Sequence, residues 1–357
     1  MRKGQTLFKS VSIFGLFLCF CMALSLAGSF QAEAAPIKLV IATWEPPKAS
    51  LAQPLRDWLK ELEERSNGRV IGEISYGAMG PPPKYYDLAV KGIAHVTLVG
   101  VPYTPGRFPL SEVVQLPVTG EMSCETLSKA YWELYRRGYF DQEFKDVKVL
   151  CLMCMVPYDL NMSKGRDVLR LSDIKGRKIR ASGAMHTRII KALGGIPVGM
   201  SAPEIPIAMQ KGTIDGNFVG VTFIKAFRTE NITKSVTKIG ISSMVFGLVM
   251  NKKIYNEMPD DIRAIVDDLG PKYSAVGGVS FDKDLQDGFN LLKGAGGKIY
   301  QLPPADMEQL GKLVAPMWQE WIAEKEAKGL PGKKIVADLY NILKGMGVQK
   351  PFHGYTP

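Results

Sequence analysis

The chain has 357 residues, of which 46% are hydrophobic, and a formal net charge of +10. This length suits two domains, and because the basic residues are scattered and mostly paired in sequence with acidic ones, we expect no nucleic-acid-binding surface. The sequence has no phosphate-binding loop, no HExxH zinc motif and no GxSxG nucleophile motif, and its three histidines are far apart, so we expect no cofactor and no metal centre.

The first residues are typical of a secretory signal peptide. A short basic head precedes an apolar run over Val11–Leu26, and an A-x-A cleavage site ends at Ala34. We expect residues 1–34 to be removed and the mature protein to begin at Ala35 in the periplasm. The mature chain has no further apolar run long enough to span a bilayer.

The mature chain opens with alternating strand and helix patterns. Apolar strands are predicted at Ile37–Thr43, Val70–Gly77 and Ile93–Gly100, with helical spacing of apolar residues between them. Trp44 follows the first of these strands, and Tyr103 follows the third. Because small-molecule sites lie beyond the carboxyl ends of parallel strands, both aromatic residues are candidates for the wall of a pocket.

A helix from about Glu125 to Arg137 precedes an extended run over Val147–Met155. Cys151 and Cys154 both lie in this run, where residues three apart point to opposite faces of a strand, which disfavours a redox or metal pair. We expect buried free thiols, and the sequence leaves open a disulfide from Cys124 to Cys151 or Cys154.

The centre of the chain is a second strand and helix series. The basic strand Lys178–Arg180, a helix ending near Gly194, the strand Ile196–Met200 and a helix from about Pro203 to Lys211 are joined by short connections. This pattern predicts a parallel α/β layer. Arg180 stands at the carboxyl end of its strand, where a planar guanidinium matches a carboxylate.

Two segments are predicted to connect the halves of the molecule. Tyr158–Asn161 carries the chain into the second half, and the β-rich run Ile239–Asn251 returns it. Pro259 to about Lys293 is mostly helical with a break or bend expected near Gly277-Gly278, and Pro316 is expected to bend or interrupt a later helix. Two strand crossings form a hinge on which one lobe can close.

These segments together resemble the DctP-type solute-binding proteins of tripartite ATP-independent periplasmic (TRAP) transporters. The resemblance rests on DIKGRKIR, ALGGIPVGM and EIPIAMQKGTIDG in the second half, and on SNGRV, GPPP and YTPGRFPLSEVVQLP in the first. It implies a two-lobed α/β fold of the type II periplasmic binding protein class, with a strand hinge and long C-terminal helices. It also implies that Arg180 forms a salt bridge with the carboxylate of the ligand.

The chain departs from the family pattern in two places. Val219 stands where the family usually has a ligand-contacting asparagine, and the family's second arginine is missing near Leu160. Arg107 and Arg166 are alternative carboxylate partners, and Asn217 is a residue that restores polarity. The loss of the asparagine indicates a less polar pocket, and a ligand less hydroxylated than a sugar acid.

The predicted ligand site therefore combines one arginine with aromatic walls. Aromatic residues at strand ends or in the crossing segments are the candidate walls, although such residues are more often part of the core, and Phe108 and Phe223 belong to this group. The expected ligand-binding residues are Arg180, Trp44, Tyr103, Asn217, Phe218 and Tyr158. This set suits an aromatic or branched monocarboxylate or a 2-oxo acid.

We predict a non-enzymatic protein that delivers an organic acid to the small and large membrane subunits of a TRAP transporter. Lobe I is expected to comprise residues 35–156 and about 241–290, and lobe II residues 157–240 and about 291–357. A module that presents its ligand to a sensor is the alternative among binding proteins. A secreted hydrolase or isomerase using His186 and Asp215 is the alternative among enzymes. The sequence alone identifies neither the ligand and its affinity nor the oligomeric state.

Overall fold

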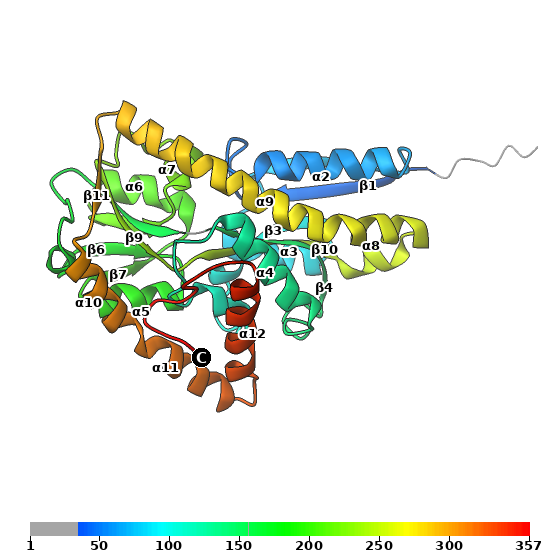
Figure 1. The fold of residues 1–357 in the computed structure, drawn as a ribbon. Coiled ribbons are helices and arrows are strands. Elements are labelled where there is room, and N and C mark those ends of the chain that lie inside the picture. The colour runs from blue at the N-terminus through cyan, green and yellow to red at the C-terminus, as the bar shows by residue number, and fades with distance from the viewer. Residues whose placement is uncertain (1–34, 156) are drawn as a thin grey trace, which may run out of the picture. The chain divides into compact units, whose positions relative to one another are not determined.

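The computed structural model describes residues 35–155 and 157–357, and the predicted signal peptide, residues 1–34, lies outside them. The described residues form two β-sheets, each flanked by helices (Figure 1). We call the first sheet with its helices the first lobe, and the second sheet with its helices the second lobe. Within the described ranges, no helix is long and apolar enough to cross a lipid bilayer.

The first sheet has the strand order β2-β1-β3-β10-β4. β1 and β3 run parallel, as the predicted strand and helix alternation requires, and β10 is antiparallel to both β3 and β4. The strands are β1 (Ile37–Thr43), β2 (Val70–Tyr76), β3 (Val96–Gly100), β4 (Val147–Met155) and β10 (Met244–Asn251). The α-helices between them are α2 (Ala52–Arg65), α3 (Tyr85–Val90) and α4 (Cys124–Arg136), with short 3-10 turns η1 (Pro82–Lys84), η2 (Val101–Tyr103) and η3 (Ser111–Gln115).

The second sheet has the order β11-β9-β5-β8-β6-β7. β7, β6 and β8 run parallel, which confirms the predicted parallel layer, whereas β5 is antiparallel to β8 and β9. The strands are β5 (Tyr158–Met162), β6 (Lys178–Ala181), β7 (Ile196–Gly199), β8 (Gly216–Val219), β9 (Ser235–Ile241) and β11 (Lys298–Gln301). The helices are α5 (Ala184–Ala192), α6 (Ile205–Gln210) and α7 (Thr222–Phe227), with turns η4 (Leu171–Ile174) and η5 (Ala202–Glu204).

The chain passes between the sheets at the two predicted crossings. β4 ends at Met155 in the first sheet, and β5 begins at Tyr158 in the second. The return crossing turns at Ser242, whose φ of 66° is uncommon for a residue with a side chain. The Ser242 hydroxyl donates to the carbonyl of Gln115 at 2.5 Å, and its N–H donates to the carbonyl of Val118 at 3.1 Å. These bonds hold the turn against the first lobe.

The long helix α9 (Asp260–Gly294) is continuous, so of the break or bend predicted near Gly277-Gly278 the break is wrong. The glycines serve close packing instead, because a Cβ on Gly278 would lie 2.5 Å from the Cα of Glu125. Asp282, one turn later, accepts hydrogen bonds from the backbone N–H groups of Cys124 and Glu125 at 2.7 and 3.1 Å. α9 therefore satisfies N–H groups at the start of α4 that have no partner within α4 itself.

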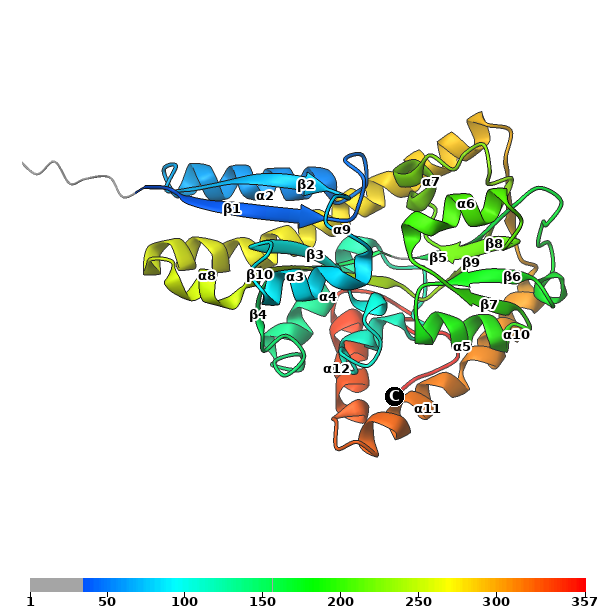
Figure 2. The ribbon, with the colours of Figure 1, turned by 180° about the vertical axis from the view of Figure 1, so that it is seen from behind.

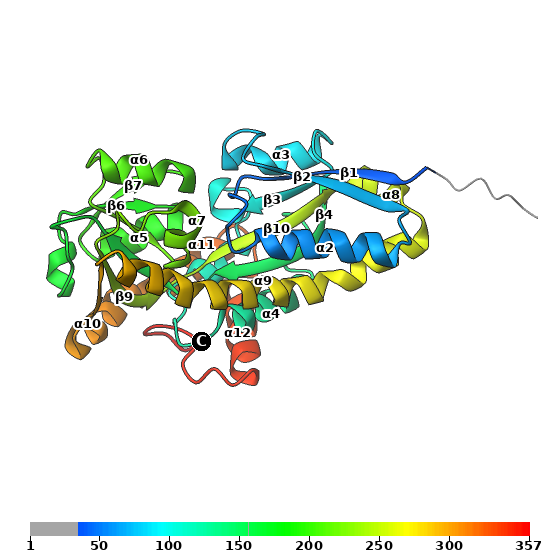
Figure 3. The same ribbon diagram turned by 90° about the horizontal axis from the view of Figure 1, so that it is seen from above.

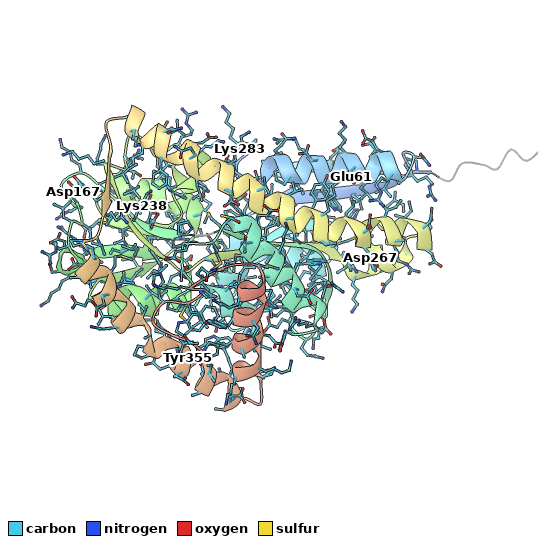
Figure 4. The ribbon with its side chains drawn as sticks, viewed as in Figure 1. Glu61, Asp167, Lys238, Asp267, Lys283 and Tyr355 are labelled. Carbon is cyan, nitrogen blue, oxygen red and sulfur yellow. The ribbon has the colours of Figure 1, made fainter. Side chains whose placement is uncertain are left out.

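α9 packs against elements of both lobes (Figure 3). It contacts α2, α4 and β4 of the first lobe, and α7 and β11 of the second. Glu61 on α2, labelled in Figure 4, accepts from Lys272 Nζ at 2.6 Å and from the Tyr273 hydroxyl at 2.9 Å, both on α9. This continuous helix thus packs against both lobes.

The remaining helices are α8 (Lys252–Glu257), α10 (Pro304–Val314), α11 (Pro316–Glu326) and α12 (Gly332–Gly345). The interruption predicted at Pro316 is confirmed, since α10 ends two residues before it and α11 begins with it. α12 returns to the first lobe and packs against α4 (Figure 2). The Tyr139 hydroxyl just beyond α4 bonds Asp338 on α12 at 2.5 Å.

The cysteines in the described part of the chain, Cys124, Cys151 and Cys154, are buried. Within residues 35–155 and 157–357, Cys151 and Cys154 are free thiols, so neither forms the disulfide with Cys124 that the sequence left open. Burial raises the pKa of Cys151 to about 12, which leaves its thiol protonated and unreactive at neutral pH.

Candidate ligand-binding site

Arg180 lies on β6, between β7 and β8, and its side chain is only 1% exposed. Nε donates to the carbonyl of Met200 at 2.9 Å. No carboxylate in the described part of the chain forms an ion pair with this guanidinium. A buried charge without a counter-charge is costly, so the site favours an external anion.

Tyr103 connects the first lobe to this arginine. Its hydroxyl oxygen accepts from Arg180 Nη2 at 3.1 Å and from the N–H of Ala202 at 3.2 Å. Both acceptor positions of the phenol are then used, so any further bond must be one in which the hydroxyl donates. The ring lies over Gly100, where a Cβ would come within 2.7 Å of it. Burial raises the pKa of Tyr103, and the positive charge of Arg180 partly offsets this.

Trp44 and Tyr103 meet because β1 and β3 are parallel neighbours that end at the same edge of the first sheet. Their ring centroids are 5.5 Å apart in an edge-to-face arrangement, and Trp44 also stacks on Phe246 of β10 at 6.0 Å. Phe281 of α9 lies 5.4 Å from Phe246. The first lobe therefore presents a continuous aromatic wall.

A cavity lies between this wall and the second lobe. It is lined by Trp44, Glu45, Ser50, Tyr103, Met155, Arg180, Ala202, Val219, Thr222, Phe223, Ala226, Phe227, Met244, Phe246 and Phe281. The centre of a water-sized sphere can move through about 30 Å³ of this cavity, and one water molecule needs roughly 10–15 Å³. A ring-sized ligand therefore requires the lobes to separate or the lining side chains to change rotamer.

Of the six predicted site residues, Arg180, Trp44 and Tyr103 line this cavity. Phe218 and Tyr158 do not, because their rings pack on each other at 5.0 Å and on His186. Asn217 is fully buried beside Arg180 in the sheet register, and its Nδ2 donates to Met209 Sδ at 3.1 Å.

Phe223 was among the aromatic residues considered from the sequence, whereas several other lining residues were not identified from it. Glu45 follows Trp44 directly, and Phe246 and Phe281 come from the return strand and the long helix. Phe223 and Phe227 on α7 stack at 4.6 Å. The spacing of four residues between Phe223 and Phe227 puts both on one face of a helix and could have indicated them from the sequence. Phe246 on β10 and Phe281 on α9 reach the cavity only through the tertiary fold.

His186 is a satisfied core histidine. Its Nδ1 contacts the Ser182 hydroxyl, and its Nε2 lies 3.0 Å from the Ser242 hydroxyl and 3.1 Å from the carbonyl of Ser243. Burial, reinforced by the charge of Arg180, lowers its pKa to about 3, so the ring is neutral. The network joins α5 to the return crossing.

The other polar candidates from the sequence lie outside the cavity. Asp215 binds Arg166 Nε at 2.9 Å and accepts from the N–H of Lys178 at 2.8 Å. Arg107 pairs with Asp87 at 2.8 Å and covers the ring of Tyr86 at 4.4 Å. These arginines anchor surface elements.

The chain is similar to known proteins in both sequence and structure. Residues 41–325 match the family described as bacterial extracellular solute-binding protein, family 7. A curated relative, solute-binding protein NAS141_03721 of Sulfitobacter sp. strain NAS-14.1, is 28% identical over 76% of this chain and 84% of its own length.

Two solved structures are 26% identical, each with a TM-score of 0.82. One is a marine metagenome TRAP solute-binding protein specific for aromatic acid ligands, in complex with metahydroxyphenylacetate, and the match covers 87% of this chain and 99% of that one. The other is a TRAP solute-binding protein from Rhodoferax ferrireducens T118 with copurified benzoate, and covers 87% and 98%. The predicted two-lobed fold is confirmed by these likenesses.

Proposed function

The chain belongs to the bacterial extracellular solute-binding proteins of family 7, and from this premise we propose that it captures a small aromatic monocarboxylate and delivers it to a TRAP transporter. Delivery is to the small and large membrane subunits of that transporter. The family is one of transport proteins, and we propose that the bound acid leaves unchanged.

The observation that carries the proposal is the buried guanidinium of Arg180. It is held by Met200 and Tyr103, both neutral partners, in a cavity with apolar walls. A carboxylate there receives charge-assisted hydrogen bonds from the guanidinium and a further one from the Tyr103 hydroxyl. Arg180, Trp44 and Tyr103 are our proposed contacts.

The aromatic character of the ligand is supported by the walls. Trp44 and Phe246 come from the first lobe, Phe223 and Phe227 from the second, and Phe281 from α9. Val219, which stands where the family usually has a ligand-contacting asparagine, also lines the cavity. Two structures with likeness to this chain hold aromatic acids, which supports the same class.

We propose a hinge mechanism for capture. The ligand enters when the lobes are apart, its carboxylate pairs with Arg180, and closure adds the wall of Trp44 and Tyr103. The closed form is favoured because only there does the ligand touch both lobes. The expected lobe boundaries, 35–156 with about 241–290 and 157–240 with about 291–357, remain part of this proposal, except that α12 packs against α4 of the first lobe.

The site of action that we propose is the periplasm, after cleavage of residues 1–34. A test for export is N-terminal sequencing of the protein recovered from the periplasmic fraction, with Ala35 as the expected first residue.

The ligand itself is best identified by mass spectrometry of small molecules released from the natively purified protein. We expect a stoichiometric aromatic monocarboxylate, recovered unchanged after prolonged incubation. Recovery of a sugar acid would contradict the aromatic class, and recovery of a chemically altered product would contradict the transport role.

A further inference from the structure

A second polar group, Glu45, lines the cavity that contains Arg180. It follows β1 and Trp44, and its N–H donates to the Thr43 hydroxyl at 3.1 Å. The residue is 7% exposed, and its Oε2 makes no hydrogen bond with any residue that the structure describes. An unpaired carboxyl oxygen buried in a ligand cavity is costly unless a ligand completes its hydrogen bonding.

The charges around Glu45 disfavour its ionised form. Asp284 on α9 is the nearby acid, and it pairs with Lys225 of α7 at 2.5 Å, so that lysine is already neutralised. Tyr103 is the titratable group that faces it from η2, and Arg180 on β6 donates a hydrogen bond to that phenol at 3.1 Å. Burial, with a smaller contribution from Asp284, raises the pKa of Glu45 to about 8.

The cavity thus has the polar groups of Arg180 and Glu45 among its aromatic lining residues. Arg180 suits an anion. Glu45 suits a neutral group that both donates and accepts a hydrogen bond, because a protonated carboxyl does the same. A hydroxyl group on the ring of an aromatic acid has this chemistry.

We propose that Glu45, as a neutral carboxylic acid, hydrogen-bonds the ring hydroxyl of a hydroxylated aromatic acid whose carboxylate is held by Arg180. This inference rests on the proposed function and adds a specificity-determining residue to it. It also makes ligand affinity sensitive to the protonation of Glu45.

The selectivity test is calorimetric titration of the purified protein with 3-hydroxyphenylacetate and phenylacetate at pH 6.5. The wild type should bind the hydroxylated acid about tenfold more tightly, the value of roughly one net hydrogen bond. Glu45→Gln, which keeps a donor and an acceptor, should retain the preference. Glu45→Leu should lose it while still binding phenylacetate.

The protonation test uses phenylacetate, which has no phenol to titrate. From pH 6.5 to 9.5 its affinity should fall about thirtyfold in the wild type, since an ionised Glu45 in the same cavity repels the carboxylate of the ligand and binding then requires Glu45 to regain a proton. Tyr103 and Lys225, whose pKa values are raised, keep their protons over this range. Glu45→Gln should show no such fall.

An unchanged hydroxyl preference in Glu45→Leu would overturn the role of Glu45 and leave the proposed function standing. An affinity that is constant or rises with pH in the wild type would likewise show an ionised or uninvolved Glu45. If the wild type binds neither acid, the aromatic ligand class fails, and the inference fails with it.

Discussion

At the level of single residues, Arg180 is the positively charged group that lines the cavity. Its side chain is as buried as the hydrophobic core, yet its partners are a backbone carbonyl and a phenol, which do not neutralise its charge. The arginines at the surface differ in this respect. Arg166, for example, pairs with Asp215 at 2.9 Å and lies outside the cavity.

We predict that Arg180→Ala loses affinity for the captured acid by roughly thirtyfold to several-thousand-fold. The reason is that truncating one member of a buried charge pair costs about 2–5 kcal/mol. Calorimetry with the acid found by mass spectrometry measures the loss, and circular dichroism confirms that the variant folds. Arg180→Lys should weaken binding as well, because a lysine lacks the planar fork of the guanidinium.

Arg166→Ala is the matched control for that experiment, since it removes a guanidinium from the surface of the same lobe. Its affinity should equal that of the wild type. Equal affinity in a folded Arg180→Ala protein would remove this arginine from the site.

At the level of elements, α9 and α4 approach so closely that no side chain fits between their backbones at Gly278. Gly278 brings the two backbones together, and Asp282 then bonds the start of α4. The packing requires a residue without a side chain, which explains why α9 contains glycine where an isolated helix would favour alanine.

We predict that Gly278→Ala destabilises the protein by about 1–3 kcal/mol or more, the usual cost of overpacking, because its Cβ would meet backbone atoms of Glu125. Urea unfolding measures the change. Gly311→Ala in α10 is the control, since a Cβ there meets no atom within 4 Å and should stabilise the helix by up to about 1 kcal/mol. Similar effects of the two substitutions would contradict the packing role of Gly278.

At the scale of the whole molecule, buried carboxyl groups couple stability to pH. Burial raises the pKa of Glu45, Glu143 and Asp159 to about 8, 7 and 6, respectively. The folded protein therefore holds these protons more tightly than the unfolded chain. Their stabilising contribution is full below the unfolded carboxyl pKa and is lost as pH rises through the folded values.

We predict that the free energy of unfolding increases by about 1–3 kcal/mol when pH is lowered from 8.5 to 6.5. His186, with a lowered pKa, opposes this only below about 6.5, where the unfolded chain takes up its proton. Urea unfolding at the two pH values measures the increase. Glu45→Gln should remove most of it, and greater stability at pH 8.5 than at 6.5 would contradict the assignment of a neutral Glu45.

The sequence by itself determined the strand and helix alternation, the parallel layer around Arg180 and the two crossings. These features depend on local periodicity and on short connections, which are visible in one segment at a time. Arg180, Trp44 and Tyr103 were proposed as site residues because each follows or ends a recognisable strand, and for Arg180 the family resemblance supplied the ligand role. Of the break or bend expected at Gly277-Gly278, the break does not occur, because a glycine pair in a helix has the same local signal whether it interrupts the helix or admits a neighbouring element.

The tertiary structure alone decided which residues share the cavity. Phe246 and Phe281 reach it from segments more than two hundred residues beyond Trp44, and no local pattern distinguishes them from core residues. Phe218 and Tyr158 have the same aromatic character, but the pleat of their strands and the position of His186 turn them into the core of the second lobe. Glu45 acquires its neutral character only from burial and from the acid on α9, since charge and solvation depend on neighbours in space, not in sequence.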